Sequence, residues 1–227
     1  MVPPASLEEV TMIEDLAERK AQARRVVRQL KKDYADAECA LNFDSPFQLL
    51  IATILSAQCT DVRVNIVTKD LFAKYPTAHD MAVAPVKTLE KMVQTTGFFR
   101  NKAKNIHAAS QALVDDYDGE VPQDLAKLVE LPGVGRKTAN VVLGTAFGIP
   151  SGIVVDTHVG RLTRRLGLTE KADAVKVEEE LMEVVPKKEW IDFSHRLIHH
   201  GRAVCNARKP KCEACHFLKF CPQEGVS

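Results

Sequence analysis

Four of the six cysteines in the 227-residue chain lie close together in its C-terminal part. They have the spacing C-x6-C-x2-C-x5-C and are Cys205, Cys212, Cys215 and Cys221. Four nearby thiolates form the ligand set of a tetrahedral metal centre, and both zinc and a [4Fe–4S] cluster accept four cysteines. Structural zinc usually shows two C-x2-C pairs and this segment has one, so the spacing predicts a metal centre and leaves its identity open. Cys39 and Cys59 stand alone and are predicted to be ordinary buried or partly buried thiols.

The segment LPGVGRK, residues 131–137, is predicted to be a tight turn that leads directly into a helix. Gly133 and Gly135 allow the backbone to adopt φ > 0 and to approach a partner closely. Because the helix begins at about Arg136, the free N–H groups around Val134, Gly135 and Arg136 and the positive dipole end face outward. A DNA phosphate is a natural occupant of such a site. The alternative is a plain corner between two helices with incidental basic residues.

Lys137 lies in the first turn of that predicted helix, where a cation is unfavourable by ~0.3–1 kcal/mol. The helix dipole and the neighbouring Arg136 both disfavour the ammonium, which favours a neutral and nucleophilic amine. Further along the chain, Asp156 precedes another helical segment, and as an N-cap its carboxylate would stay ionised. One nucleophilic amine and one ionised carboxylate would suit glycosidic chemistry at a deoxyribose. The alternative for Asp156 is a plain helix cap.

Three basic residues, Arg208, Lys209 and Lys211, lie in the gap between the first two clustered cysteines. A loop that a metal ties at both ends presents its charges in fixed positions. We therefore predict that this loop grips DNA phosphates, while the alternative is that it carries ordinary solvated charges.

The composition is that of a globular protein, with 45% hydrophobic and 27% charged residues. It excludes a disordered tail protein, a collagen and a low-complexity scaffold, and no apolar stretch approaches the ~18 residues of a membrane span. The first residues lack the apolar segment of a secretory signal, so we expect a soluble, cytoplasmic protein. A net charge of +1 does not indicate a nucleic-acid binder, but the acid-free segment 193–212 shows that one face can still be basic.

Hydrophobic residues recur at helical spacing along nearly the whole chain, and the alternating pattern of strands is missing. A capping box at residues 6–9 is predicted to open the first helix, and Ser45-Pro46 to cap an apolar core helix over 47–57. Further helices are expected at 60–75, 85–94, 100–117, 136–147, 156–166, 175–185 and 189–200, with a short one ending at 130. The sequence therefore predicts an all-α fold of about ten helices, with a lobe boundary near residues 148–152.

Taken together, these features resemble the endonuclease III family of DNA glycosylases over residues 41–221. The resemblance is carried by LLIA at 49–52, LSAQ at 55–58 with TD at 60–61, Gly97 with KAKNI at 102–106, LPGVGRKTANVV at 131–142, VDTH at 155–158 and the four-cysteine set. Three departures from the family pattern stand out. Phe98 and Cys59 occupy positions where leucine and alanine are usual, and the segment between Lys137 and Asp156 is one residue longer than in common bacterial members.

The resemblance implies two helical lobes. Residues 39–149 would form a six-helix lobe with a helix–hairpin–helix at the glycine turn. Residues 1–38 and 150–227 would form the second lobe, in which the four cysteines hold a structural [4Fe–4S] cluster. Lys137 and Asp156 would face each other across the cleft between the lobes.

The resemblance also implies a bifunctional DNA glycosylase and AP lyase of base excision repair, monomeric and, in a prokaryote, associated with the nucleoid. Its partner would be double-stranded DNA that contains oxidised pyrimidines or abasic sites. Lys137 would be the nucleophile and Asp156 its electrostatic partner. Gln58 would hydrogen-bond to the base opposite the flipped nucleotide, and Phe98 would insert as an apolar wedge. Phe99 is the rival for that role, and the alternative for Phe98 is burial in the core.

Two other functions compete with this interpretation. One is a monofunctional mismatch glycosylase, but the adenine-mismatch branch lacks a lysine at the position of Lys137 and has a glutamate at that of Thr53. The other is a helical DNA-binding protein with a structural metal and no enzymatic activity. Borohydride trapping of a covalent protein–DNA adduct separates the first interpretation from both.

Overall fold

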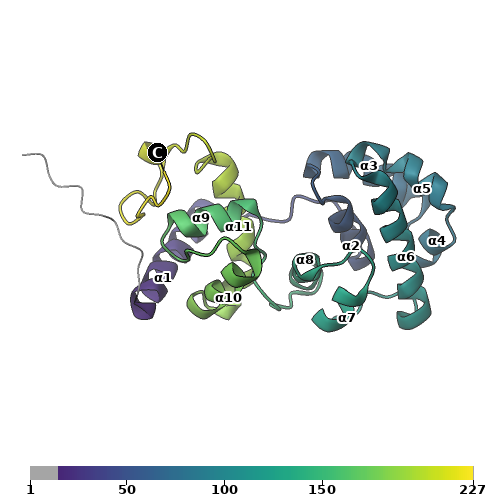
Figure 1. The fold of residues 1–227 in the computed structure, drawn as a ribbon, viewed down its shortest axis with the longest axis horizontal. Helices are drawn as coiled ribbons and strands as arrows, with labels where there is room; N and C mark the ends of the chain where they lie inside the picture. The colour runs from purple at the N-terminus through teal and green to yellow at the C-terminus, as the bar shows by residue number, and fades with distance from the viewer. Residues whose placement is uncertain (1–14, 227) are drawn as a thin grey trace, which may run out of the picture. The chain divides into compact units, whose positions relative to one another are not determined.

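The computed structural model describes residues 15–226, which form eleven α-helices, three short 3-10 helices and no strand (Figure 1). The predicted all-α fold is thereby confirmed. The capping box expected at residues 6–9 lies outside the described residues. Among the helices that are described, none is long and apolar enough to cross a membrane. The chain divides into two compact units, Cys39–Ser151 and Met1–Glu38 with Gly152–Ser227.

Seven α-helices and one 3-10 helix, Gln94–Thr96, build the unit of residues 39–151. The α-helices are α2 (Pro46–Leu55), α3 (Asp61–Lys74), α4 (Ala78–Ala82), α5 (Val86–Met92), α6 (Phe99–Tyr117), α7 (Leu125–Glu130) and α8 (Arg136–Phe147). Helix α4 was not predicted, because five residues are too few to show a helical period. Its start is marked by a capping box in which Thr77 and Asp80 each accept a hydrogen bond from the other's backbone N–H.

Helix α2 forms the centre of this unit, since every residue from Phe47 to Leu55 is buried. Its beginning follows the predicted signals: the Ser45 side chain accepts a hydrogen bond from the Gln48 N–H, and Pro46 occupies the first turn. Because the helix is fixed on all sides, the exposed turn that follows it is held on a rigid support.

The second unit contains α1 (Leu16–Asp33), α9 (Thr157–Arg165), α10 (Ala174–Val184) and α11 (Trp190–Ala203). Its core includes Val26, Leu30, Leu162, Leu197 and Phe217. Beyond α11, the described chain has only one short 3-10 helix, Cys212–Ala214. Phe217 lies fully buried in the core and therefore anchors this irregular C-terminal segment to the helices.

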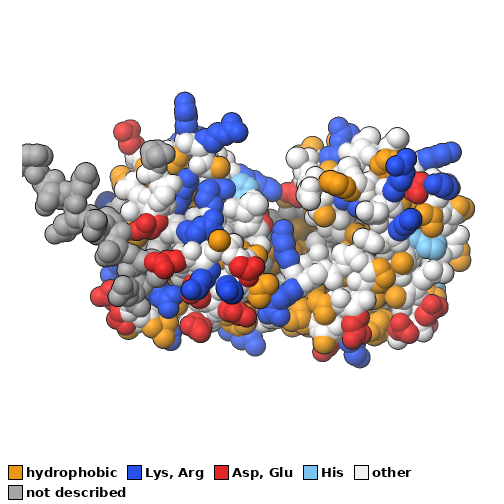
Figure 2. All heavy atoms as spheres, in the orientation of Figure 1, with side chains coloured by type: hydrophobic (Ala, Val, Ile, Leu, Met, Phe, Trp, Pro, Cys, Tyr) orange, Lys and Arg blue, Asp and Glu red, His pale blue; other side chains and the backbone are white. Residues whose placement is uncertain are grey.

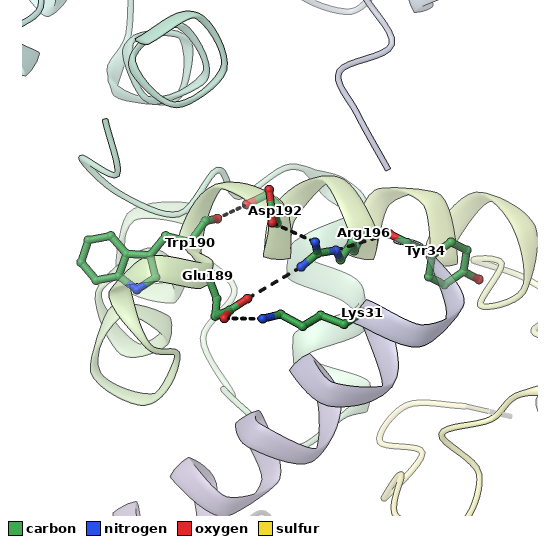
Figure 3. Close-up of polar contacts among 7 residues, drawn as sticks. Lys31, Tyr34, Glu189, Trp190, Asp192 and Arg196 are labelled. Atoms are coloured by element: carbon green, nitrogen blue, oxygen red, sulfur yellow. Dashed lines mark hydrogen bonds and ion pairs between the residues drawn. The ribbon is translucent and has the colours of Figure 1, made fainter. Parts of the chain in front are cut away.

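A network of charges around the buried Glu189 joins α1 to the start of α11 (Figure 3). The Glu189 carboxylate is only 4% exposed and accepts from Lys31 Nζ at 2.6 Å, with Arg196 Nη1 at 3.7 Å. Arg196 also donates to Asp192 at 2.8 Å and to the Tyr34 carbonyl at 3.3 Å. A buried carboxylate is tolerated only when it is paired, so this network fixes how the two helices pack.

Candidate functional site

The glycine turn connects α7 to α8 through residues 131–135. Gly133 has φ +78°, and the Val134 N–H donates to the Leu131 carbonyl at 3.0 Å, which closes the turn. A Cβ atom at Gly133 would lie 2.8 Å from the Asn105 side chain of α6. Glycine is therefore required at this position both by the left-handed backbone and by the close approach of α6.

Helix α8 begins at Arg136, as predicted, and its N-cap residue Gly135 offers no side chain to cap it. The N–H groups of its first turn consequently have no side-chain cap, which is the arrangement that favours an anion. Lys137 lies in this turn with an exposed side chain. Val134 is 6% exposed and packs in the core, and the Leu131 carbonyl occupies its N–H, so the N–H groups of the turn that can meet a phosphate are those of Gly133 and Gly135.

Asp156 is the N-cap of α9, and its Oδ1 accepts a hydrogen bond from the Val159 N–H at 2.7 Å. The predicted cap is thus present, and it leaves Oδ2 without a hydrogen bond to any residue of the described chain. Nearby, burial lowers the pKa of His158, while the Asp156 carboxylate acts in the opposite direction. Asp156 is half-buried and belongs to the second unit, whereas Lys137 belongs to the first.

All four clustered cysteines line a single pocket whose walls include Leu162, Leu166, Val204, Phe217 and Leu218. Within residues 15–226, however, no three His, Cys, Asp or Glu side chains converge closely enough to hold a single metal ion. Thiolates around one zinc ion would lie about 3.8 Å apart, because each Zn–S bond is about 2.3 Å. A [4Fe–4S] cluster binds one cysteine at each of four irons, and four thiols around one pocket are the donors that such a cluster requires.

Two residues that the sequence analysis missed hold these cysteines. Arg165 is 7% exposed and donates to the Cys205 Sγ at 3.2 Å, while its own carbonyl accepts from the Cys221 Sγ at 3.3 Å. His200 is 2% exposed, and its Nε2 lies 3.5 Å from the Cys215 Sγ. Burial raises the pKa of the Cys221 thiol to about 11 and also raises the pKa of the Cys215 thiol, so a metal bound there must displace the protons of these two thiols.

The basic loop between Cys205 and Cys212 is held by more than its cysteines. The Arg165 guanidinium donates to the carbonyls of Asn206 at 2.8 Å and Ala207 at 2.9 Å. The three predicted phosphate-binding side chains, Arg208, Lys209 and Lys211, are exposed. Lys211 Nζ also donates to the Ala203 carbonyl at 3.1 Å, which leaves Arg208 and Lys209 as the less engaged pair. Lys and Arg side chains gather on the surface over this segment and α9 (Figure 2).

Gln58 and Phe98 share an unusual backbone conformation. Both are exposed, and they have φ +52° and +47°, in the left-handed region that bulky residues rarely adopt. Phe98 is 68% exposed, whereas Phe99 packs against the core of its unit. Of the two phenylalanines, Phe98 is therefore the one whose ring is available to a partner, and its burial in the core is ruled out.

Comparisons with known proteins all match this chain to base excision DNA repair proteins. The model of the HhH-GPD superfamily of base excision DNA repair proteins matches residues 51–187. Endonuclease III of Synechocystis sp. is 50% identical over 217 residues, which cover 96% of this chain and 99% of that protein. Endonuclease III of Bacillus subtilis is also 50% identical, over 193 residues that cover 85% of this chain and 87% of the relative.

Solved structures agree with the sequence relatives. A trapped covalent intermediate of an endonuclease III with DNA, an estranged-adenine complex, matches with a TM-score of 0.85 and 49% identity over 89% of this chain and 95% of that one. A non-covalent endonuclease III–DNA complex matches with a TM-score of 0.84 and 49% identity over 89% and 94% of the two chains.

Proposed function

Since the chain belongs to the endonuclease III family of base excision repair enzymes, which are DNA glycosylases and AP lyases, we propose that it removes oxidised pyrimidines from duplex DNA. In this proposal the protein acts as a monomer. After it removes the base, it nicks the strand at the abasic site through a lysine Schiff base. The observation that carries the proposal is the exposed Lys137 in the first turn of α8, directly after the glycine turn.

The reaction begins when the damaged nucleotide leaves the base stack, since its C1′ atom is inaccessible inside the duplex. The Lys137 amine attacks C1′ and loses a proton, and the bond to the base breaks with the electron pair leaving on the base, which takes up a proton. The Asp156 carboxylate stabilises the positive charge that develops on the sugar. The sugar ring opens as the nitrogen forms an imine with C1′. Loss of a C2′ proton then expels the 3′ phosphate by β-elimination, and water releases Lys137.

The test of this function is a panel of duplexes, each with one defined oxidised pyrimidine, an abasic site or a mismatch. We expect excision and 3′-side nicking at the oxidised pyrimidines, nicking at the abasic site, and a borohydride-trapped adduct with both kinds of substrate. Base release at mismatches alone, with neither nicking nor an adduct, would show a monofunctional glycosylase instead. Binding with no base release at all would leave only a DNA-binding protein.

In this proposal the four cysteines hold one [4Fe–4S] cluster, whose role is structural because no iron position is left open for substrate. The support is that all four thiols line one pocket, in a chain that belongs to the endonuclease III family. We expect the purified protein to be yellow-brown, with broad visible absorbance and about four irons per chain. A colourless preparation with one stoichiometric zinc would contradict the assignment.

The basic loop is proposed to grip phosphates, since Arg165 fixes its carbonyls while its charged side chains stay exposed. Neutralising Arg208, Lys209 and Lys211 together should weaken binding to any DNA sequence. It should also flatten the salt dependence of binding by up to ~0.9 per lost phosphate contact. The matched control replaces Arg24, Lys176 and Lys188, one exposed arginine and two exposed lysines of the same unit, by Gln. A salt slope equal to that of the control protein would refute the assignment.

Gln58 and Phe98 are proposed to enter the duplex when the base flips, because both are exposed on turns held by buried elements. Gln58→Ala and Phe98→Ala should each slow excision from a duplex more than cleavage of an abasic site in a single strand, where there is no stack to fill. Phe99→Leu serves as the control, since Phe99 packs against the core. If both substrates slow equally, the two side chains do not act as wedges.

A further inference from the structure

The first half of α6 contains a buried lysine that the proposed reaction does not use. Lys102 is 5% exposed, and its Nζ donates to the Thr96 carbonyl at 2.6 Å. An ammonium group carries three N–H donors, and this is its one hydrogen bond to the residues that the structure describes. Burial lowers the pKa of Lys102, which shows that the site opposes the charge it holds. A lysine kept in such a place calls for an explanation beyond packing.

The Lys102 side chain holds the turn that presents Phe98. Its ammonium bonds to the carbonyl of Thr96, directly before Gly97 and Phe98, while its backbone N–H donates to the Phe98 carbonyl at 3.1 Å as the first backbone bond of α6. Gly97 and Phe98 both have positive φ, at +72° and +47°. A phenylalanine stays in this conformation only when its surroundings impose it, and the Lys102 ammonium supplies one of the constraints.

The other exposed side chain proposed to enter the duplex lies beyond a neighbouring helix. Gln58, whose backbone is also left-handed, lies in the turn after the buried helix α2. Helix α6, which carries Lys102, packs against α2. The two turns are therefore held by helices that are in contact with each other.

We propose that Lys102 is a positioning residue for base flipping, whose buried ammonium fixes the turn that presents Phe98. The inference rests on the proposed role of Phe98 in the duplex. An apolar side chain of equal length would fill the same space, but it would leave the buried carbonyl of Thr96 without this donor. The Phe98 turn would then have other conformations open to it.

The test compares Lys102→Met, which keeps the length of the side chain, with Lys102→Arg, which keeps a cationic donor. Lys91→Met is the control, since Lys91 is exposed on α5 of the same unit. Lys102→Met should slow single-turnover excision from a duplex about ten- to a hundredfold, because small misplacements of positioning groups have effects of this size. Cleavage of a single-stranded abasic site should stay within about twofold of the control, and Lys102→Arg should regain most of the duplex rate.

Two further measurements separate positioning from a loss of folding. The fluorescence of 2-aminopurine placed next to the lesion should show slower base flipping in Lys102→Met, with a Tm close to that of the control. In a Phe98→Ala background, Lys102→Met should have little further effect on the duplex rate, because both changes then remove the same function. If Lys102→Met does not fold, the same comparison is made with Lys102→Gln.

Three outcomes overturn the inference: an unchanged duplex rate, equal slowing on both substrates with a lowered Tm, or additive effects with Phe98→Ala. These are distinguishable from a failure of the proposed function. If Gln58→Ala and Phe98→Ala slow only the duplex reaction while Lys102→Met does not, the inference alone falls. If the wild-type protein excises no base from the duplex, the proposed function falls first.

Discussion

Lys137→Gln is expected to abolish both borohydride trapping and strand cleavage while leaving the binding of damaged DNA largely intact. Glutamine keeps a polar side chain of similar length but removes the amine that forms the Schiff base. The exposed position of Lys137 on the first turn of α8 means that the substitution buries nothing and leaves the glycine turn in place. Trapping with an abasic duplex, a cleavage gel and a binding titration measure the three properties separately.

The control for this prediction is Lys91→Gln, which removes an exposed lysine of α5 in the same unit. It should trap and cleave as the wild-type protein does. A trapped adduct that forms at the wild-type rate in Lys137→Gln would show that the nucleophile is elsewhere. The N-terminal amine would be the next candidate, and the bifunctional mechanism assigned to Lys137 would fall.

Asp156→Asn should slow the glycosylase step by roughly 10²–10³, the usual effect of removing one preorganised interaction with transition-state charge. Asparagine caps helices about as well as aspartate, so the bond from the Val159 N–H at the start of α9 can be kept. The loss of rate then reports the charge of the carboxylate. Single-turnover base release and thermal melting must be measured on the same preparation.

Asp156→Ala is the comparison that separates the two roles of this residue. It removes the charge and the cap together, and the cap alone contributes about 1 kcal/mol to stability. We expect a lower Tm than for Asp156→Asn with a similar loss of rate. If Asp156→Asn releases bases at the wild-type rate, Asp156 is only the cap of α9 and has no electrostatic role.

The local parts of the candidate site could be predicted from the sequence. Helix α8 has the predicted bounds, because glycine in the turn before it and Gly148 after it restrict the backbone over a few residues. Asp156 caps α9 for a similarly local reason, since a carboxylate next to a helical segment can accept a hydrogen bond from an N–H group of the first helical turn. Such helix-start and helix-end signals depend on residues that are adjacent in the sequence, so the sequence alone is enough to predict them.

The contacts between distant segments could not be predicted. Arg165 bonds to a cysteine 40 residues away, and no local pattern indicates which arginine of a helix faces the cysteine pocket. Phe98 and Phe99 are chemically the same, and their different exposure depends on a left-handed turn fixed by Lys102. The pairing of Lys102 with Thr96 follows from how α6 enters the core, which becomes visible only in three dimensions.

The uncapped start of α8 has a consequence for thermodynamic linkage. A helix whose first N–H groups lack a side-chain cap is less stable at that end than one that begins with serine or aspartate. If a phosphate of the DNA backbone takes the place of the cap, the free energy of DNA binding includes the free energy of ordering the first turn of α8. DNA should then raise the hydrogen-exchange protection of the first turn of α8 more than that of its last turn. The segment that presents Lys137 would thus gain its full order from the substrate itself.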